Sequence, residues 1–290
     1  MFAIVLWVIS AAFDSTSLSF RKKAIDTWNL SKTMFKYFAF IFWFIIILFL
    51  NYSFWLQFSI LEDYDYLLIC LFIVIVWIIN TFLQLHIFKT VKLSETLPYN
   101  NLDKLFIILI WTILYYWTEQ QPSLITIWTA LLTILLILAL SIDFNKFKIP
   151  KSIWLFTLFK LIKAIIIVLI WIVLLKYTNF TFIAVNWLYE LIIFTLIAII
   201  SKDTFKSMLI QTKVFYISRF SAAVLWRSAY IIWLYIIQTS WLIVATLLWF
   251  LGIVFNIISM KFILKDTPEK KQILLAIMVL ILIWIWYYFK

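Results

Sequence analysis

Residues 66–88 read YLLICLFIVIVWIINTFLQLHIF, a stretch without lysine, arginine, aspartate or glutamate. A helix needs about 20 predominantly apolar residues to cross the hydrocarbon core of a bilayer. This stretch is also longer than an ordinary buried strand, so it predicts a transmembrane helix. In the whole chain of 290 residues, 67% are hydrophobic and 13% are charged, and the mean hydropathy is +1.10. Soluble domains carry about 25% charged residues, so this composition excludes a soluble globular protein.

Apolar runs separated by charges or prolines divide the rest of the chain in the same way. We therefore predict an all-α polytopic protein of the cell membrane, with about ten transmembrane helices. No basic residue precedes the first run, and Arg21, Lys22 and Lys23 follow it, which favours a retained helix over a signal peptide. The predicted spans are 2–20, 33–50, 66–88, 99–116, 122–142, 153–175, 180–201, 217–238, 240–263 and 270–289.

The basic residues are concentrated in alternate connections between these spans. The even-numbered connections hold only Lys176, and 51–65 carries three acids instead. By the positive-inside rule the odd-numbered connections are cytoplasmic and both termini face outward. The net charge of +11 is thus a signal of topology, and no nucleic-acid partner is expected. The basic connections are 21–36, 89–104, 143–152, 202–219 and 261–271.

The glycine content of the chain is unusual. It has one glycine, Gly252, and 17 tryptophans, whereas average usage of about 7% would give about 20 glycines. Small residues normally let membrane helices approach one another. Two interpretations stay open: a genuinely tryptophan-rich chain, or a gene whose UGA codons encode glycine and were translated as tryptophan. The codons at these positions, or the intact mass of the natural protein, would decide between them.

Motifs for catalysis are missing from the sequence. There is no HExxH, glycine-rich phosphate loop, nucleophile elbow or CxxC. A single cysteine, Cys70, allows neither an internal disulfide nor a thiolate metal cluster. We therefore predict that the protein is not an enzyme and uses no cofactor or metal.

Two similar turns separate predicted spans in the two halves of the chain. In the first, Glu119 is followed by Pro122, and in the second, Asp266 is followed by Pro268. An acid and a proline suit the start of a helix, so two good helix caps explain both turns. The other interpretation is a repeat of five helices, with residues 1–147 and 148–290 as its two copies. An odd number of spans per copy orients the copies oppositely, as in many secondary transporters.

This layout and these turns resemble the drug/metabolite transporter superfamily, in its EamA-like branch. Leu97 and Pro98, before the span 99–116, are similar to a proline-led helix start of that family. The resemblance implies a 5+5 inverted repeat that moves a small polar metabolite, such as an amino acid, by alternating access. It also implies cytoplasmic termini, against the charge distribution. Trp117 and Trp128 stand where the family tends to have small residues.

Several polar side chains lie inside predicted spans, where a central charge costs about 2.5–3.5 kcal/mol. Lys160 and Lys163 are three residues apart and share a helix face. The offset between the two turns maps Asn80 onto Arg227, and Asp14 between the two lysines. This recurrence predicts a midplane site. The side chains expected to line it are Asp14, Asn80, Gln84, Lys160, Lys163, Glu190, Arg227 and Asn256, and all of these except Lys160 are the expected substrate-binding residues.

Cationic groups opposite acidic ones suit a zwitterionic or anionic metabolite. Proton coupling would use Asp14 or Glu190 as the carrier. The alternative is structural pairing between helices, or snorkelling of Lys160, which lies near the start of its span. His86 lies at a span end near Lys89, so a solvated histidine explains it better than a proton relay.

We therefore predict a secondary transporter surrounded by the lipid bilayer, with a small-molecule substrate and with a homodimer as a candidate assembly. The alternative is a non-transporting membrane anchor or scaffold subunit of a larger complex. Its intramembrane charges would then pair with a helix of the partner.

Overall fold

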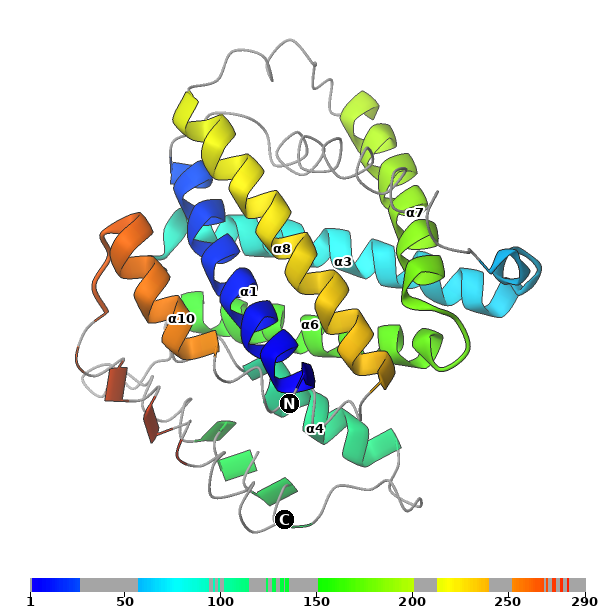
Figure 1. The fold of residues 1–290 in the computed structure, drawn as a ribbon, viewed down its shortest axis with the longest axis horizontal. Coiled ribbons are helices and arrows are strands. Elements are labelled where there is room, and N and C mark those ends of the chain that lie inside the picture. Colours follow the sequence, from blue (N-terminus) through cyan, green and yellow to red (C-terminus); the bar gives the residue numbers. More distant parts are fainter. Residues whose placement is uncertain are drawn as a thin grey trace.

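The computed structural model describes residues 2–26, 57–93, 102–114, 151–200, 213–239 and 252–268, with isolated residues between 96 and 135 and between 270 and 281. The described residues contain helices and no strand (Figure 1). The helices of the continuous segments are α1 (Phe2–Asp26), α3 (Tyr64–Thr90), α4 (Leu102–Leu114), α6 (Lys151–Leu174), α7 (Asn179–Ile200), α8 (Lys213–Thr239) and α10 (Gly252–Ser259). A 3₁₀ turn, η1 (Phe58–Glu62), precedes α3, and a π turn, η5 (Met260–Leu264), follows α10.

Four of the described helices are long and apolar enough to cross a membrane, namely Tyr64–Thr90, Ile153–Leu174, Asn179–Ile200 and Lys213–Ile237. The chain is therefore an all-α membrane protein. These helices confirm the predicted spans 66–88, 153–175, 180–201 and 217–238 to within a few residues. They form because each run is about 20 or more residues long, predominantly apolar and without an interior proline.

The remaining spans agree less closely or lie outside the described residues. Helix α1 continues to Asp26 instead of ending at residue 20, and α4 (Leu102–Leu114) lies within the predicted span 99–116. Of the predicted span 240–263, the structure describes α10 and η5. The spans 33–50, most of 122–142 and most of 270–289 lie outside the described residues, and the count of ten spans stays a prediction.

Two antiparallel helix pairs form the centre of the bundle. Helix α1 packs along α8, and α3 packs along α6, as Figure 1 shows. Ser10 Oγ in α1 donates a hydrogen bond to Ala229 O in α8 at 2.9 Å. Helix α4 covers α6, α10 covers α1, and α7 crosses α3. The largest apolar core lies between α3, α6, α7 and α8, around the buried side chains of Ile166, Phe182 and Leu234.

Helices α1 and α10 approach closely through small residues. Ser15 Oγ donates to Gly252 O at 2.9 Å, and the hydroxyls of Ser19 and Ser259 lie 2.9 Å apart. A Cβ added at Gly252 would lie 3.3 Å from Ser15 Oγ. Small residues bring membrane helices into van der Waals contact, and hydroxyls join them across the interface. The single glycine of the chain therefore lies at a close helix contact.

We expect Gly252→Leu to lower the free energy of unfolding by about 1–3 kcal/mol, because overpacking forces the two helices apart. The substitution also strains the hydrogen bond from Ser15 to Gly252 O. Thermal unfolding of the detergent-solubilised protein measures the effect. Val254→Leu, at a 44% exposed position on the same helix, is the matched control. Equal midpoints for the two variants would contradict close packing at this site.

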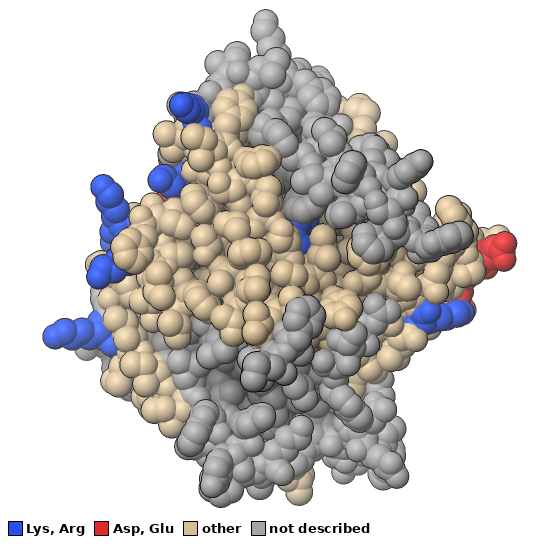
Figure 2. Space-filling model, viewed as in Figure 1, with Lys and Arg blue, Asp and Glu red and all other residues tan. Residues whose placement is uncertain are grey.

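The two ends of the bundle carry opposite charges. At one end, Lys22 of α1 donates a hydrogen bond to Phe88 O near the end of α3. At the other end, Glu62, Asp63 and Asp65 surround the start of α3. In Figure 2 most of the basic side chains lie on the left, and prominent acidic ones lie on the right beside a basic group. We call these the basic end, at the C-terminal ends of α1 and α3, and the acidic end, at the start of α3.

Candidate functional site

A polar cavity of about 70 Å³ lies between α1, α3, α4, α6, α8 and α10. Its charged lining residues are Asp14 and Arg21 of α1, Lys104 of α4, and Lys160 and Lys163 of α6. A water molecule needs about 10–15 Å³ measured in this way, so the space fits a compact ligand of several non-hydrogen atoms. The uncharged polar lining residues are Ser15, Ser17, Asn80, Thr81, Gln84 and Asn256.

The structure brings most of the predicted site residues together in this cavity. Those that line it are Asp14, Asn80, Gln84, Lys160, Lys163 and Asn256. Glu190 and Arg227 instead line a separate, smaller pocket. The substrate-binding role of each residue stays a prediction, but the proximity of six of them is a structural fact.

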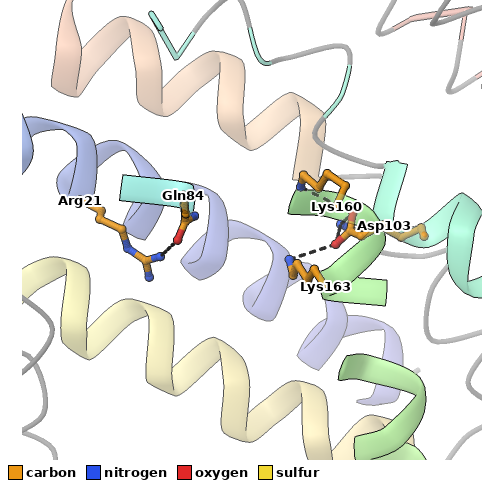
Figure 3. A network of polar contacts seen from close by, with 6 residues as sticks. Arg21, Gln84, Asp103, Lys160 and Lys163 are labelled. Carbon is orange, nitrogen blue, oxygen red and sulfur yellow. Dashed lines mark hydrogen bonds and ion pairs between the residues drawn. The ribbon is translucent and has the colours of Figure 1, made fainter. Parts of the chain in front are cut away.

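A buried carboxylate that the sequence analysis missed organises the lysines. Asp103, in the first turn of α4, is fully buried. Its Oδ1 lies 2.9 Å from Lys104 Nζ and 3.6 Å from Lys160 Nζ, and its Oδ2 lies 3.0 Å from Lys163 Nζ. Figure 3 shows Lys160 and Lys163 directed at this carboxylate. The alternative of a snorkelling Lys160 is therefore wrong, because its ammonium group is buried at the carboxylate.

Lys104 is a second correction. It was counted with the basic segment 89–104 as a signal of topology and not as a site residue, but it lies buried in α4 and lines the cavity. The available signal was an adjacent acid and base, Asp103 and Lys104, inside the predicted span 99–116. Charged side chains within an apolar run need polar partners on another helix. Here Lys160 and Lys163 of α6 are the partners of Asp103.

Arg21 is the third residue whose role differs from the expectation. Its position suggested the interfacial end of the first span, yet it lines the cavity from within α1. Arg21 Nη1 donates a hydrogen bond to Gln84 Oε1 at 2.8 Å, as Figure 3 shows. Its guanidinium carbon lies 5.3 Å from the ring centroid of Trp226. Asp14 lies two helical turns earlier on α1 and lines the same cavity as Arg21 and Lys163.

Two amide side chains of the cavity lining have buried acceptors that no described residue satisfies. Asn80 is 3% exposed and Asn256 is 7% exposed, and both line the cavity. Neither Oδ1 atom has a hydrogen-bond partner among the described residues. Leaving a buried acceptor unpaired costs about 1–3 kcal/mol. The cavity lining therefore combines cationic side chains with two amide side chains whose buried acceptors are unpaired.

The smaller pocket, of about 10 Å³, contains the other two predicted charges. Glu190 Oε2 of α7 lies 3.2 Å from Arg227 Nη2 of α8, and both side chains are buried. The Arg227 guanidinium carbon lies 4.5 Å from the ring centroids of Trp187 and of Trp226. Cation–π contacts of this kind strengthen when water is excluded. The ion pair is thus a structural connection between α7 and α8 as well as a polar group inside the membrane.

The turn residues and the histidine have simpler surroundings. Asp266 N donates to Met260 O at 3.3 Å, and Lys265 before it has a left-handed backbone with φ of 55°, so the π turn η5 ends here. Pro268 follows in the same segment. His86 is exposed, in agreement with a solvated helix-end residue. Glu119 and Pro122, the other turn, lie outside the described residues.

At the acidic end, a polar contact joins two even-numbered connections. Lys176 Nζ and Tyr177 OH both donate to Asp63 Oδ2, the second at 2.8 Å. The amide of Thr178 donates to Gln57 Oε1 at 2.8 Å. We call these residues, Gln57, Asp63, Lys176, Tyr177 and Thr178, the acidic-end latch. It places the connections before α3 and after α6 side by side, which agrees with the alternating topology.

We expect the latch to be insensitive to pH across the physiological range. The hydrogen bond from Lys176 holds the pKa of Asp63 below 3.8, and the same bond raises the pKa of Lys176 above 10.5. A lowered acid pKa contributes stability that is lost as pH falls below 3.8, and a raised lysine pKa contributes stability that is lost above 10.5. The small stability difference between the native chain and Lys176→Gln should therefore be constant between these limits and should shrink below the lower one. Unfolding midpoints measured against pH, with Lys89→Gln as control, test this; a difference that changes near neutral pH would contradict it.

Among the described residues, no three histidine, cysteine, aspartate or glutamate side chains come together as metal ligands. Comparison with known proteins adds no family. No protein-family model matches the chain, and no curated protein sequence matches it.

Proposed function

We propose that this protein is a secondary transporter that moves a small polar metabolite across the cell membrane by alternating access. The observation that carries the proposal is the polar cavity, which is buried among apolar helices and receives charged side chains from both halves of the chain. Ionisable residues inside membrane helices are expensive, and they usually mark a pathway for a substrate or an ion.

The cavity chemistry supports an anionic or zwitterionic substrate. Asp103 pairs with the lysines and would by itself explain them as a structural cluster. It does not explain the unsatisfied Oδ1 atoms of Asn80 and Asn256 on the same cavity wall. A ligand that bears both an anionic group and hydrogen-bond donors would satisfy both sets at once. The volume of about 70 Å³ limits this ligand to a compact metabolite.

The helix contacts support the inverted repeat of the drug/metabolite transporter type, EamA-like branch. In the predicted order of spans, α1 and α6 are the first helices of the two halves, and α3 and α8 are the third. If the two halves are equivalent, α1 corresponds to α6 and α8 corresponds to α3. A contact between α1 and α8 then predicts an equivalent contact between α6 and α3. Both pairs occur, and both are antiparallel. This correspondence favours a pseudo-twofold arrangement of the two halves.

The rival function, a membrane anchor for a larger complex, receives less support. It would need intramembrane charges that await a partner helix. In the described residues, Asp103 pairs with lysines of the same chain, and Glu190 pairs with Arg227. The buried carboxylates of Asp103 and Glu190 are therefore already paired within one protomer.

Counterflow in liposomes tests the proposal. Liposomes preloaded with pooled amino acids and small carboxylates should accumulate the labelled compound of the same kind when they contain the native chain. Lys163→Gln should reduce this uptake, because it removes an ammonium group from the cavity wall. Lys89→Gln, at an exposed position of the basic end, is the control. Absence of counterflow from folded protein with every compound, together with a stoichiometric copurified partner, would favour the anchor instead.

We expect Asp14→Asn to remove any dependence of uptake on a pH gradient. Asp14 lines the cavity, whereas Glu190 is held in an ion pair outside it, so Asp14 is the better proton carrier of the two. Uptake measured with and without a pH gradient gives the result. An unchanged response to the gradient in this variant would assign the coupling elsewhere.

A further inference from the structure

Two tryptophans form the wall between the cavity and the Glu190–Arg227 pocket. Trp77 of α3 and Trp226 of α8 line both spaces, and no other described residue does. Their rings are stacked, with centroids 5.6 Å apart and planes inclined by 29°. The two polar spaces are thus separated by a single aromatic layer.

The two tryptophans separate the cavity from the pocket along the direction of α3 and α6. On α3 the cavity is lined from Trp77 to Phe88, toward the basic end, whereas the pocket is lined by Ile73 and Val74, toward the acidic end. Helix α6 runs antiparallel and shows the reverse order, with Lys163 in the cavity and Ile170 in the pocket. At 1.5 Å rise per residue, the two spaces are successive positions along the bundle axis.

The two sides of the wall share three kinds of polar group, although only the cavity also has lysines. The cavity offers a guanidinium from Arg21, a carboxylate from Asp14 and the unsatisfied amide oxygen of Asn80. The pocket offers a guanidinium from Arg227, a carboxylate from Glu190 and the amide oxygen of Asn186. Asn186 is 7% exposed, and its Oδ1 has no partner among the described residues. A ligand that suits the first set of groups therefore suits the second.

We propose that the Glu190–Arg227 pocket is a second binding station for the transported substrate, and that the stacked Trp77 and Trp226 form the gate between the two stations. This inference rests on the proposed transport function. The pocket of about 10 Å³ has the size of one water molecule, so the substrate enters it only when the rings separate and the pocket widens. Arg227 then binds the anionic group of the substrate, and Asn186 Oδ1 accepts from its donor.

The contacts of Trp226 explain how the gate is held closed. Arg21 approaches its ring from the cavity at 5.3 Å, and Arg227 approaches it from the pocket at 4.5 Å. Beyond it toward the acidic end, Trp226 stacks on Tyr230 with centroids 5.6 Å apart, and Tyr230 stacks on Trp233 at 5.9 Å. An anion that draws Arg21 or Arg227 away removes a cation–π contact from the gate. Binding of the substrate and opening of the gate are coupled in this way.

The first test separates binding from turnover in liposomes. Asn186→Ala should lower the counterflow rate by about tenfold and leave the substrate affinity unchanged, because it acts after the first station. Asn80→Ala should weaken the affinity itself. Equal counterflow rates for Asn186→Ala and the native chain would overturn the second station. A loss of substrate affinity in Asn186→Ala would also overturn it, because the cavity and the pocket would then form a single binding site. Absence of counterflow from the native chain would overturn the proposed function itself.

The second test needs no substrate. In a Cys70→Ala background, the variants Asn80→Cys and Asn186→Cys place one thiol in the cavity and one in the pocket. The rate at which each thiol reacts with a small methanethiosulfonate measures the accessibility of that space. With the wall intact, we expect the cysteine at 186 to react about tenfold more slowly than that at 80. Trp226→Ala should bring the two rates together, whereas Trp154→Ala, at a 56% exposed tryptophan of α6, should leave their ratio unchanged. Similar rates with the wall intact, or no response to Trp226→Ala, would overturn the gate.

Discussion

Asp103→Ala is expected to lower the free energy of unfolding by about 3–5 kcal/mol, because it leaves buried cations without the carboxylate that they share. Three ammonium groups lie within 3.6 Å of this one side chain, and the carboxylate is fully buried. The loss combines the attraction between the groups with the cost of keeping positive charges out of water. Chemical unfolding of the detergent-solubilised protein measures it.

Two further variants separate charge from shape at this position. Asp103→Asn keeps the size of the side chain and removes its charge, so it should destabilise the protein nearly as much as alanine. Adding Lys160→Met to Asp103→Asn should restore part of the stability, because it removes one of the cations. Asp65→Ala, an exposed acid at the acidic end, is the control. A stability of Asp103→Ala equal to that of the control would show that the lysines do not depend on this carboxylate.

Glu190→Leu is expected to destabilise the protein by a similar amount, about 3–5 kcal/mol, because Arg227 then stays buried without its carboxylate. Glu190 and Arg227 are 3.2 Å apart, and both side chains are buried. The double variant Glu190→Leu with Arg227→Met replaces the pair by apolar groups of similar size. Such replacements of a buried ion pair are often neutral, so the double variant should unfold close to the native chain.

The double-mutant cycle also separates stability from transport. If the pair serves stability alone, the double variant should regain counterflow together with its fold. If Arg227 binds substrate at a second station, the double variant should fold and still fail in counterflow. Unfolding midpoints and counterflow rates, measured on the same four proteins, give the coupling energy and the functional result. Additive losses in the two single variants would contradict a direct interaction between Glu190 and Arg227.

The sequence determined the class of the fold because hydropathy acts locally. A run such as 66–88 meets the length requirement of a bilayer wherever it lies in the chain, and the structure has a helix there. Asp14, Asn80 and Lys163 were recognisable for a related reason, since a polar group inside such a run has to find a polar environment. The structure places these three together in one cavity.

Residues near the ends of helices were beyond this reasoning. Arg21 follows an apolar run and Lys104 lies near the start of the predicted span 99–116, so the sequence position of each suggests a charge at the membrane interface. Their burial depends on helices distant in the chain, because Gln84 of α3 accepts from Arg21, and α6 brings Lys160 and Lys163 to the carboxylate beside Lys104. The sequence around a positive charge at the end of a span does not show whether a neighbouring helix covers that charge.

The sequence alone thus determined an all-helical membrane protein with polar groups inside its spans, because chain length and hydropathy decide which segments the bilayer accepts. Only the tertiary structure decided how those groups divide into sites. Asp14 and Arg227 lie in separate spaces because Trp77 and Trp226, from helices far apart in the chain, stack between the two. That separation arises from side-chain packing between α3 and α8, which no local property of either segment specifies.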